Sequence, residues 1–193
     1  MAFLLIAGSP TSHSRSAALL EGVARQLQAQ GGTVARLAVR DVNAQALLHA
    51  DFSHPDIAAT AAQLAQAEAV VIATPVYKAA YSGVLKAWLD MLPQAALQGK
   101  TVLPLATGGS PHHMLVLDYA LRPVLQSLGA RHILAGVYAT DAQVQLPAEA
   151  AAPVQLAEAL QQRLDDALRT LWSELRTSRR RQPSDSVAQP ALP

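Results

Sequence analysis

Residues 1–20 of the chain read MAFLLIAGSPTSHSRSAALL. An apolar run over 3–7 (FLLIA) ends at Gly8, and the hydroxyl-rich stretch GSPTSHSRS (8–16) leads directly into a helical pattern. A short apolar run closed by a glycine predicts a buried strand, and serine and threonine favour the first positions of a helix. This stretch therefore predicts a strand, a polar loop and a helix in succession.

The same alternation continues along the chain. Further strands are expected at 34–39, 69–73, 101–106 and 132–138, and helices at 14–30, 56–66, 83–92, 113–128 and 153–175. Strands that alternate with helices indicate parallel βαβ units, and the nearly continuous apolar runs at 3–7, 69–73 and 101–106 are typical of strands buried on both faces. We predict an α/β fold, a flavodoxin-like three-layer sandwich with a five-stranded parallel sheet of order 2-1-3-4-5.

The composition is that of a folded protein. Of 193 residues, 51% are hydrophobic and 15% are charged, and the formal net charge is +1. The absence of cysteine excludes disulfides, thiolate nucleophiles and zinc–thiolate sites. No apolar run approaches the roughly 18 residues of a membrane span, and the N-terminus has no basic segment typical of a signal peptide. We expect a cytoplasmic protein with no membrane contact.

The C-terminus differs from the rest of the chain. Five of the 15 basic residues lie between Arg169 and Arg181, and the following stretch, QPSDSVAQPALP, has little to bury. We expect one domain over 1–177 and a disordered, basic, Pro- and Ser-bearing tail over 178–193. Basic tails can contact nucleic acid, but a solvated extension is the simpler interpretation, and we expect no nucleic-acid partner.

Three loops carry the distinctive sequences: GSPTSHSRS (8–16), TPVYKAAYSG (74–83) and TGGSPHH (107–113). Each follows a predicted strand, namely the first, third and fourth. In an open parallel sheet, ligands bind beyond the carboxyl ends of the strands, where the winding direction reverses. In this strand order the reversal lies between strands 1 and 3, so we expect the three loops to form one site.

The first loop has the character of a phosphate site. Ser9, Ser14 and Ser16 offer hydroxyl donors, Arg15 offers a charge, and the start of a helix presents unpaired N–H groups. A helix cap alone accounts for one or two of these hydroxyls. With Gly8 as the only glycine, the loop matches neither GxGxxG nor GxxxxGK[ST]. We therefore expect a phosphate held by hydroxyls, as in a mononucleotide such as FMN.

The other two loops suit a flat ring. Pro75 is expected to end the third strand, and the residues after it form a mixed apolar, aromatic and cationic edge. Gly108 and Gly109 allow the main chain to approach a planar group, although glycine pairs also make ordinary turns. Lys86 and Asp90 are expected to pair on a helix surface. His112 and His113 lack a carboxylate cluster, so we expect them to face solvent and expect no metal site.

The stretches GSPTSHSRSAALLE, ATPVYKAAYSGVLKAWLDMLP and ALQGKTVLPLATGGSPHHMLVLDYALRPVL resemble the NAD(P)H-dependent FMN reductases of the flavodoxin-like superfamily, in particular the SsuE-type reductases of two-component alkanesulfonate monooxygenase systems. The resemblance covers about residues 2–175. It implies an enzyme that transfers hydride from NADPH, or NADH, to N5 of FMN. The reduced FMN would pass to a partner monooxygenase that cleaves sulfonates for sulfur acquisition. Because the cofactors carry this chemistry, we expect no catalytic acid or base side chain.

The resemblance also assigns binding residues. It places the FMN phosphate at Ser9, Ser14 and Ser16 with Arg15 nearby, although Thr11 stands close to the position where many relatives have arginine. The residues that it places at or near the flavin ring are Pro75, Val76, Tyr77, Lys78, Tyr81, Ser82, Gly83, Thr107, Gly108 and Gly109. N–H donors of the glycine loop would stabilise the negative charge of reduced flavin.

Tyr119 is a separate expectation. The resemblance places it in a helix at the interface of a homodimer or homotetramer, where SsuE-type enzymes have a π-bulge. Independently, Pro123 has no N–H to donate to the carbonyl of residue 119, so a regular helix is interrupted there. A simple proline kink is the alternative. The apolar stretches VLKAWLDML and MLVLDYAL exceed what one sheet needs, which also favours an oligomer.

Two other functions stay open from the residues alone. A quinone or azo reductase that keeps FMN as a prosthetic group would use the same loops. A flavodoxin-type electron carrier is disfavoured, because such carriers are usually strongly acidic and this chain is nearly neutral. The residues do not distinguish NADPH from NADH, since Arg15, Lys78 and Arg122 are all candidate partners for a 2′-phosphate.

Overall fold

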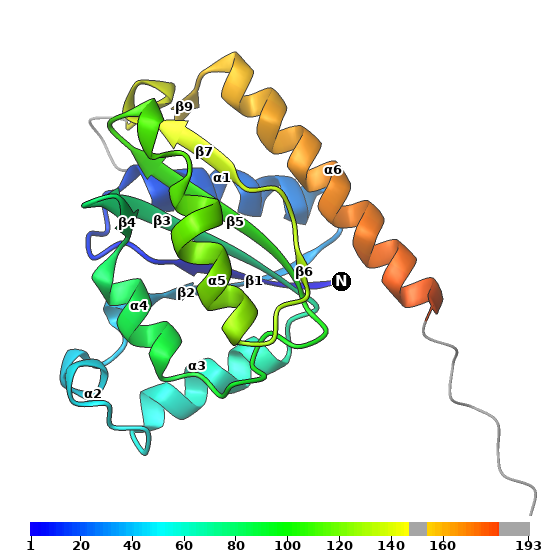
Figure 1. Ribbon diagram of the computed structural model, residues 1–193. Coiled ribbons are helices and arrows are strands. Elements are labelled where there is room, and N and C mark those ends of the chain that lie inside the picture. The colour runs from blue at the N-terminus through cyan, green and yellow to red at the C-terminus, as the bar shows by residue number, and fades with distance from the viewer. Residues whose placement is uncertain (147–153, 182–193) are drawn as a thin grey trace, which may run out of the picture.

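A parallel sheet forms the centre of the computed structural model, which describes residues 1–146 and 154–181 (Figure 1). Its strands run in the order β2, β1, β3, β5, and β5 also pairs with two short strands, β6 and β7. The bounds are β1 Ala2–Ala7, β2 Thr33–Ala38, β3 Ala69–Tyr77, β5 Thr101–Gly108, β6 His132–Ile133 and β7 Val137–Thr140. The predicted order 2-1-3-4-5 is confirmed, with the fifth strand in two pieces.

Helices cover both faces of this sheet, as predicted. Helices α1 (Arg15–Ala29) and α6 (Glu158–Arg181) lie on one face, and α3 (Pro55–Ala65), α4 (Gly83–Asp90) and α5 (Arg122–Ser127) lie on the other (Figure 1). The side chains of β1 show why both faces are apolar. Phe3 and Leu5 enter the core beneath α1 and α6, whereas Leu4 and Ile6 enter the core beneath the other three helices.

Two prolines lie inside the sheet, and one of them departs from expectation. Pro75 does not end β3, which continues to Tyr77 and pairs Pro75 with Thr107. The last residue of β3 that pairs with β1 is Ala73, so beyond it one side of β3 needs no N–H and proline fits. Pro104 lies in the middle of β5, opposite the gap between β6 and β7, where its missing N–H interrupts the ladder.

The helix predicted over 113–128 is irregular. A 3₁₀ turn over Pro111–His113 is followed by a π-helix over Leu117–Leu121, which includes Tyr119, and then by α5. The Arg122 N–H donates to the carbonyl of Leu117, five residues back. The irregular helix around Tyr119 is therefore present as a π-turn, and the 113–128 segment is shorter and less regular than the sequence predicted.

Three expectations about the helices are wrong. In the VLKAWLDML stretch, Leu85, Trp88 and Leu89 are fully or almost fully buried in the core of the same chain, so this stretch is not surplus apolar surface. Helix α6 continues to Arg181, so residues 178–181 are helical and do not belong to a tail. Residues 182–193 lie outside the described part of the chain. The start expected at 153 is also wrong, because α6 begins at Glu158.

Short elements complete the fold. Helix α2 (Ala44–His49), which the sequence did not predict, precedes α3, and β4 (Ala80–Tyr81) forms a hairpin with β3. Strands β8 (Val144–Gln145) and β9 (Gln155–Leu156) form a small antiparallel pair. Within 1–146 and 154–181, no helix has the length and apolar character needed to cross a membrane.

Candidate functional site

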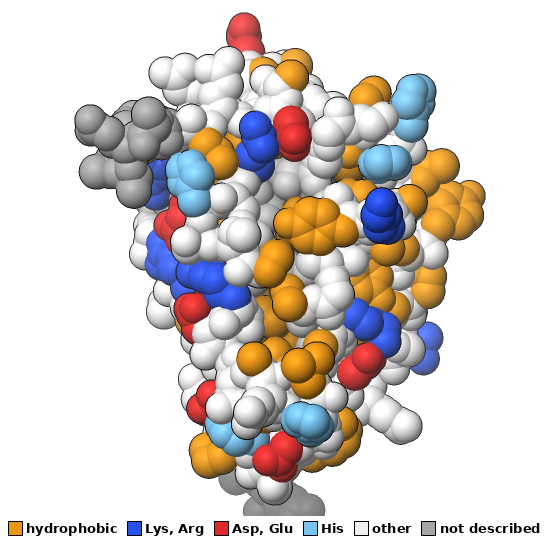
Figure 2. All heavy atoms as spheres, turned by 90° about the vertical axis from the view of Figure 1, so that its left-hand side faces the viewer, with side chains coloured by type: hydrophobic (Ala, Val, Ile, Leu, Met, Phe, Trp, Pro, Cys, Tyr) orange, Lys and Arg blue, Asp and Glu red, His pale blue; other side chains and the backbone are white. Residues whose placement is uncertain are grey.

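The three distinctive loops meet at the carboxyl edge of the sheet, around a cavity of about 220 Å³. Figure 2 looks onto this edge, where hydrophobic side chains run through the middle of the surface and cationic and His side chains flank them. The wall consists of Thr11, His13, Ser14, Arg15, Pro75, Val76, Tyr77, Thr107, Gly108, Gly109, Asp141 and Leu146. Eight of the residues predicted to bind flavin thus surround one space.

Hydroxyl pairs organise the first loop. Ser14 caps α1 by accepting the Ala17 N–H at 3.2 Å, and its Oγ lies 3.4 Å from that of Ser16. Ser9 is fully buried and accepts the Thr11 N–H at 3.2 Å. The N–H groups of the first helical turn have no carbonyl four residues back, and they carry the partial positive charge of the helix. Hydroxyls and amides of this kind fit a phosphate group.

Arg15 is held by a part of the chain that the sequence did not connect with it. Its Nε donates to the Val144 carbonyl at 3.2 Å, and its Nη1 lies 3.5 Å from Oδ2 of Asp141. Asp141 follows β7 in a 3₁₀ turn and lines the cavity beside Gly109. Sequence reasoning missed Asp141, because no motif surrounds it and only the fold brings it to Arg15.

Ser82 has a structural position rather than a place in the cavity wall. Its buried Oγ donates to the Gly8 carbonyl and accepts the Leu85 N–H at 3.2 Å, and its own N–H donates to Thr74 at 3.0 Å. A Cβ on Gly8 would lie 2.9 Å from Leu85, so only glycine allows this close approach. Ser82 therefore joins the ends of β1 and β3 to the start of α4 and holds the two loops together.

The second loop is a tight hairpin. Val76 pairs with Tyr81 and Tyr77 with Ala80, which leaves Lys78 and Ala79 as the two turn residues. Their φ angles are 50° and 61°, the positive values that a type I′ turn requires. Pro75, Val76 and Tyr77 line the cavity, whereas Lys78, Tyr81 and Gly83 are outside its wall. The hairpin therefore presents one edge of the loop to the cavity.

The third loop is shaped by Tyr138 on β7. The Tyr138 hydroxyl donates to the Ser110 carbonyl at 2.6 Å, and a Cβ on Gly108 would lie 2.6 Å from that hydroxyl oxygen and 3.2 Å from Cβ of Val76. Burial, and then the charge of Asp141, raises the pKa of Tyr138. Sequence reasoning missed Tyr138, because only the pairing of β7 with β5 brings it beside the glycine loop.

Other polar residues singled out from the sequence lie elsewhere. Lys86 and Asp90 pair at 2.7 Å on α4 as predicted, and the hydrogen bond to Asp90 raises the pKa of Lys86. Arg122 donates to the carbonyls of Ile133 and Leu134, both at 3.2 Å, so it anchors the strand β6 and does not face the cavity. His112 and His113 are exposed.

The cavity fits part of a phosphorylated flat molecule. One end offers hydroxyls and helix amides, and the other offers an apolar wall from Pro75 and Val76 opposite a glycine loop. Its volume is below the roughly 300–1,000 Å³ of most ligand pockets, so the part of the chain that the structure describes encloses only part of a mononucleotide.

Comparisons with known proteins agree with this geometry. The sequence profile of the family described as NADPH-dependent FMN reductase matches residues 1–145. The FMN reductase (NADPH) of Pseudomonas putida is 49% identical over 170 residues, which cover 88% of this chain and 86% of the relative. That of Escherichia coli is 47% identical over 175 residues, which cover 91% and 90%. Among solved structures, the apo form of an NADH:FMN oxidoreductase, EMOB, matches with a TM-score of 0.76 and 35% identity, covering 96% of this chain and 91% of that one.

Proposed function

Because the chain belongs to the NADPH-dependent FMN reductase family, and is thus an oxidoreductase that reduces FMN with NADPH, we propose that it releases the reduced FMN to a partner monooxygenase. The observation that carries this proposal is the cavity, which is small and in whose described wall the one arginine, Arg15, is already paired with a carboxylate. Such a site favours a flavin that exchanges over one that is retained. The SsuE-like loop sequences support an alkanesulfonate monooxygenase as the partner and sulfur acquisition as the role.

The residues of the cavity have distinct parts in this proposal. Of the three serines of the first loop, Ser14 lines the cavity, whereas Ser9 and Ser16 are buried and lie outside its described wall. We assign the flavin phosphate to Ser14 and the first amides of α1, with Ser9 and Ser16 reached only when the loop adjusts, and Arg15 adds its charge when it leaves Asp141. The remaining contacts to the ring come from Pro75, Val76, Tyr77, Thr107, Gly108 and Gly109. When both are bound, NADPH supplies the hydride and FMN accepts it. The chain's own task is to align the two ligands and to present N–H donors, so we assign no side chain as acid or base.

A homo-oligomer belongs to the same proposal. Tyr119 is 79% exposed and, with the exposed Met114 and Leu115, forms an apolar surface on and before the π-helix. Strand β4 of the site hairpin contacts this π-helix, so a second copy seated here would border the incomplete cavity. We expect the wild-type chain to sediment as a dimer or tetramer and a Tyr119→Glu variant to dissociate. A wild-type monomer would remove this part of the proposal.

The first experiment is anaerobic NADPH oxidation by flavin-free protein, with FMN varied from below to far above the enzyme concentration. We expect saturation by FMN, many turnovers per enzyme and accumulation of free reduced FMN. Flavin that copurifies tightly, with turnover that depends on a quinone and not on added FMN, would instead identify the prosthetic-FMN quinone or azo reductase.

A second experiment tests the partner. An alkanesulfonate monooxygenase, O₂ and a sulfonate are added to the reductase with FMN and NADPH, and sulfite is measured. We expect sulfite release that depends on the reductase. As a comparison, chemically reduced FMN is supplied to the monooxygenase at the same free concentration. If sulfite is then released as fast as with the reductase, the reduced flavin reaches the monooxygenase by diffusion. No sulfite at all, with FMN reduction intact, would reject this partner.

A further inference from the structure

Asp141 and Arg15 are the charged pair of the cavity. In its described wall they are the only Asp, Glu, Lys or Arg residues, and Nη1 of Arg15 lies 3.5 Å from Oδ2 of Asp141. The Val144 carbonyl accepts a hydrogen bond from Nε of the same guanidinium. The cation that would attract a phosphate is therefore turned toward the segment after β7.

The segment that carries Asp141 is held in place by surrounding contacts. Gln143 accepts the Thr140 N–H at 3.0 Å, and the two side chains close a capping box around the 3₁₀ turn. Arg163 on α6 donates to the Tyr138 carbonyl at 2.9 Å. The carboxylate also lies near the glycine loop, since a Cβ on Gly109 would be 3.9 Å from Oδ2. Asp141 thus has a defined position between the phosphate end and the ring end of the cavity.

A carboxylate at this position opposes a phosphate ligand in two ways. It repels the phosphate charge directly, and it occupies the guanidinium that the phosphate needs. The side chains of Arg15 and Asp141 are 40% and 46% exposed, and ion pairs of such exposure are weak. Arg15 is therefore able to change partner, but only in competition with Asp141.

We infer that Asp141 is a specificity-determining residue that competes with the flavin phosphate for Arg15, and that this competition keeps FMN binding weak enough for the flavin to exchange. The inference rests on the proposed function, in which FMN is reduced and then released. In this inference Asp141, which lies outside the three loops, decides whether the flavin exchanges as a substrate or is retained.

The test is the dissociation constant of oxidised FMN and of riboflavin, measured by quenching of flavin fluorescence. Asp141→Asn keeps the shape of the side chain and removes its charge. We expect FMN to bind about tenfold more tightly to this variant, while riboflavin, which has no phosphate, changes less than about twofold. Because the effect is electrostatic and both side chains are partly exposed, the gain in FMN affinity should shrink at high salt.

Two further variants make the test specific. Asp166→Asn removes a carboxylate that pairs with Arg169 on α6, away from the cavity wall, and should leave both constants unchanged. In an Arg15→Gln background, Asp141→Asn should tighten FMN binding much less than in the wild-type background, because only the direct repulsion is then removed and there is no guanidinium left to release.

Three results would overturn the inference: unchanged or weaker FMN binding by Asp141→Asn, an equal gain for riboflavin, or the full gain in the Arg15→Gln background. The last result would show direct repulsion without competition. These failures are separable from failure of the proposed function, which would appear as a wild-type chain that does not bind FMN or that retains it through turnover.

Discussion

At the scale of single residues, close approach decides which positions of the cavity are glycine. A Cβ on Gly108 would lie 2.6 Å from the Tyr138 hydroxyl oxygen, whereas the nearest atom to a Cβ on Gly109 is 3.9 Å away. Gly108 is therefore required by the protein's own packing. Gly109 has room for a side chain, so the protein's own packing does not require glycine there. Without a side chain, Gly109 leaves space in the cavity for a ligand.

This contrast predicts opposite behaviour for two alanine variants. Gly108→Ala should lose about 1–3 kcal/mol of unfolding free energy through overpacking, measured by urea denaturation. Gly109→Ala should unfold close to wild type but bind FMN at least several-fold more weakly. In Gly108→Ala, adding Tyr138→Phe should recover part of the loss, because it removes the hydroxyl oxygen at 2.6 Å. The nearest atom of that side chain to the new Cβ is then the ring carbon Cζ, at 3.5 Å. Equal stability of the two alanine variants would contradict this account.

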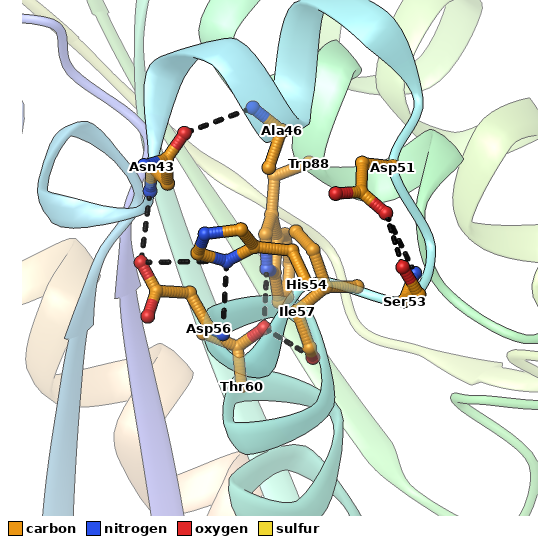
Figure 3. Close-up of polar contacts among 9 residues, drawn as sticks. All are labelled: Asn43, Ala46, Asp51, Ser53, His54, Asp56, Ile57, Thr60 and Trp88. Atoms are coloured by element: carbon orange, nitrogen blue, oxygen red, sulfur yellow. Dashed lines mark hydrogen bonds and ion pairs between the residues drawn. The ribbon is translucent and has the colours of Figure 1, made fainter.

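At the scale of elements, polar side chains connect the segment after β2 to α4. Figure 3 shows Asn43 at the start of α2 and His54 at the start of α3, each capping its helix. Nδ1 of His54 accepts the Asp56 N–H at 3.2 Å. In the same view, the indole N–H of Trp88 donates to Thr60 at 3.1 Å. Trp88 is fully buried, so this hydroxyl satisfies the only polar atom of its side chain.

We predict that Thr60→Val destabilises the protein by about 1–3 kcal/mol, because the shape is kept while a buried donor loses its acceptor. Thr60→Ser retains the hydroxyl and serves as the matched control. Urea unfolding followed by tryptophan fluorescence measures both variants. If valine is tolerated as well as serine, the hydrogen bond from Trp88 does not stabilise the packing of α4 on α3.

The β3–β4 hairpin makes a second prediction at this scale. Ala79 has a φ of 61°, a conformation that costs a non-glycine residue roughly 1–2 kcal/mol. Ala79→Gly should therefore stabilise the chain by about 1 kcal/mol in urea unfolding. Ala80→Gly, one residue further along in β4, should destabilise it, since glycine weakens a strand. Destabilisation by Ala79→Gly would contradict the type I′ geometry.

At the scale of the whole molecule, an ion pair connects the end of α6 to the amino edge of the sheet. Arg179 donates twice to Glu68, at 2.6 and 2.9 Å, and the Ala2 N–H donates to the same carboxylate at 3.2 Å. The hydrogen bond from Arg179 is the main cause that lowers the pKa of Glu68. Residues more than a hundred positions apart in the chain are thereby joined.

This lowered pKa predicts a pH dependence of stability. Glu68 binds its proton less readily in the folded state than in the unfolded state. The stabilisation that ionised Glu68 gives the folded state is therefore fully present above the ordinary glutamate pKa of about 4.3, and it is lost as the pH falls through the pKa of Glu68 in the folded state. Glu68→Gln should lower Tm by a few degrees at pH 7, and the difference from wild type should vanish as the pH falls below 4.

Arg179→Gln should give the same profile, and the double variant should add nothing further, because both changes remove one interaction. A constant difference in Tm between wild type and Glu68→Gln across this pH range would show that the carboxylate acts through packing and not through its charge.

The sequence by itself determined the alternation of buried strands and helices, because hydrophobic periodicity and turn residues are local properties of the chain. The strand order and the gathering of three loops at one sheet edge followed from the fold class that this alternation indicates. The interruption of the helix at Tyr119 was also readable from Pro123. Only the tertiary structure decided that Pro75 continues a strand, that Ser82 joins three elements instead of facing the cavity, and that Tyr138 and Asp141 enter the site. These outcomes depend on register and packing between distant segments, and such contacts leave no pattern in the residues around them.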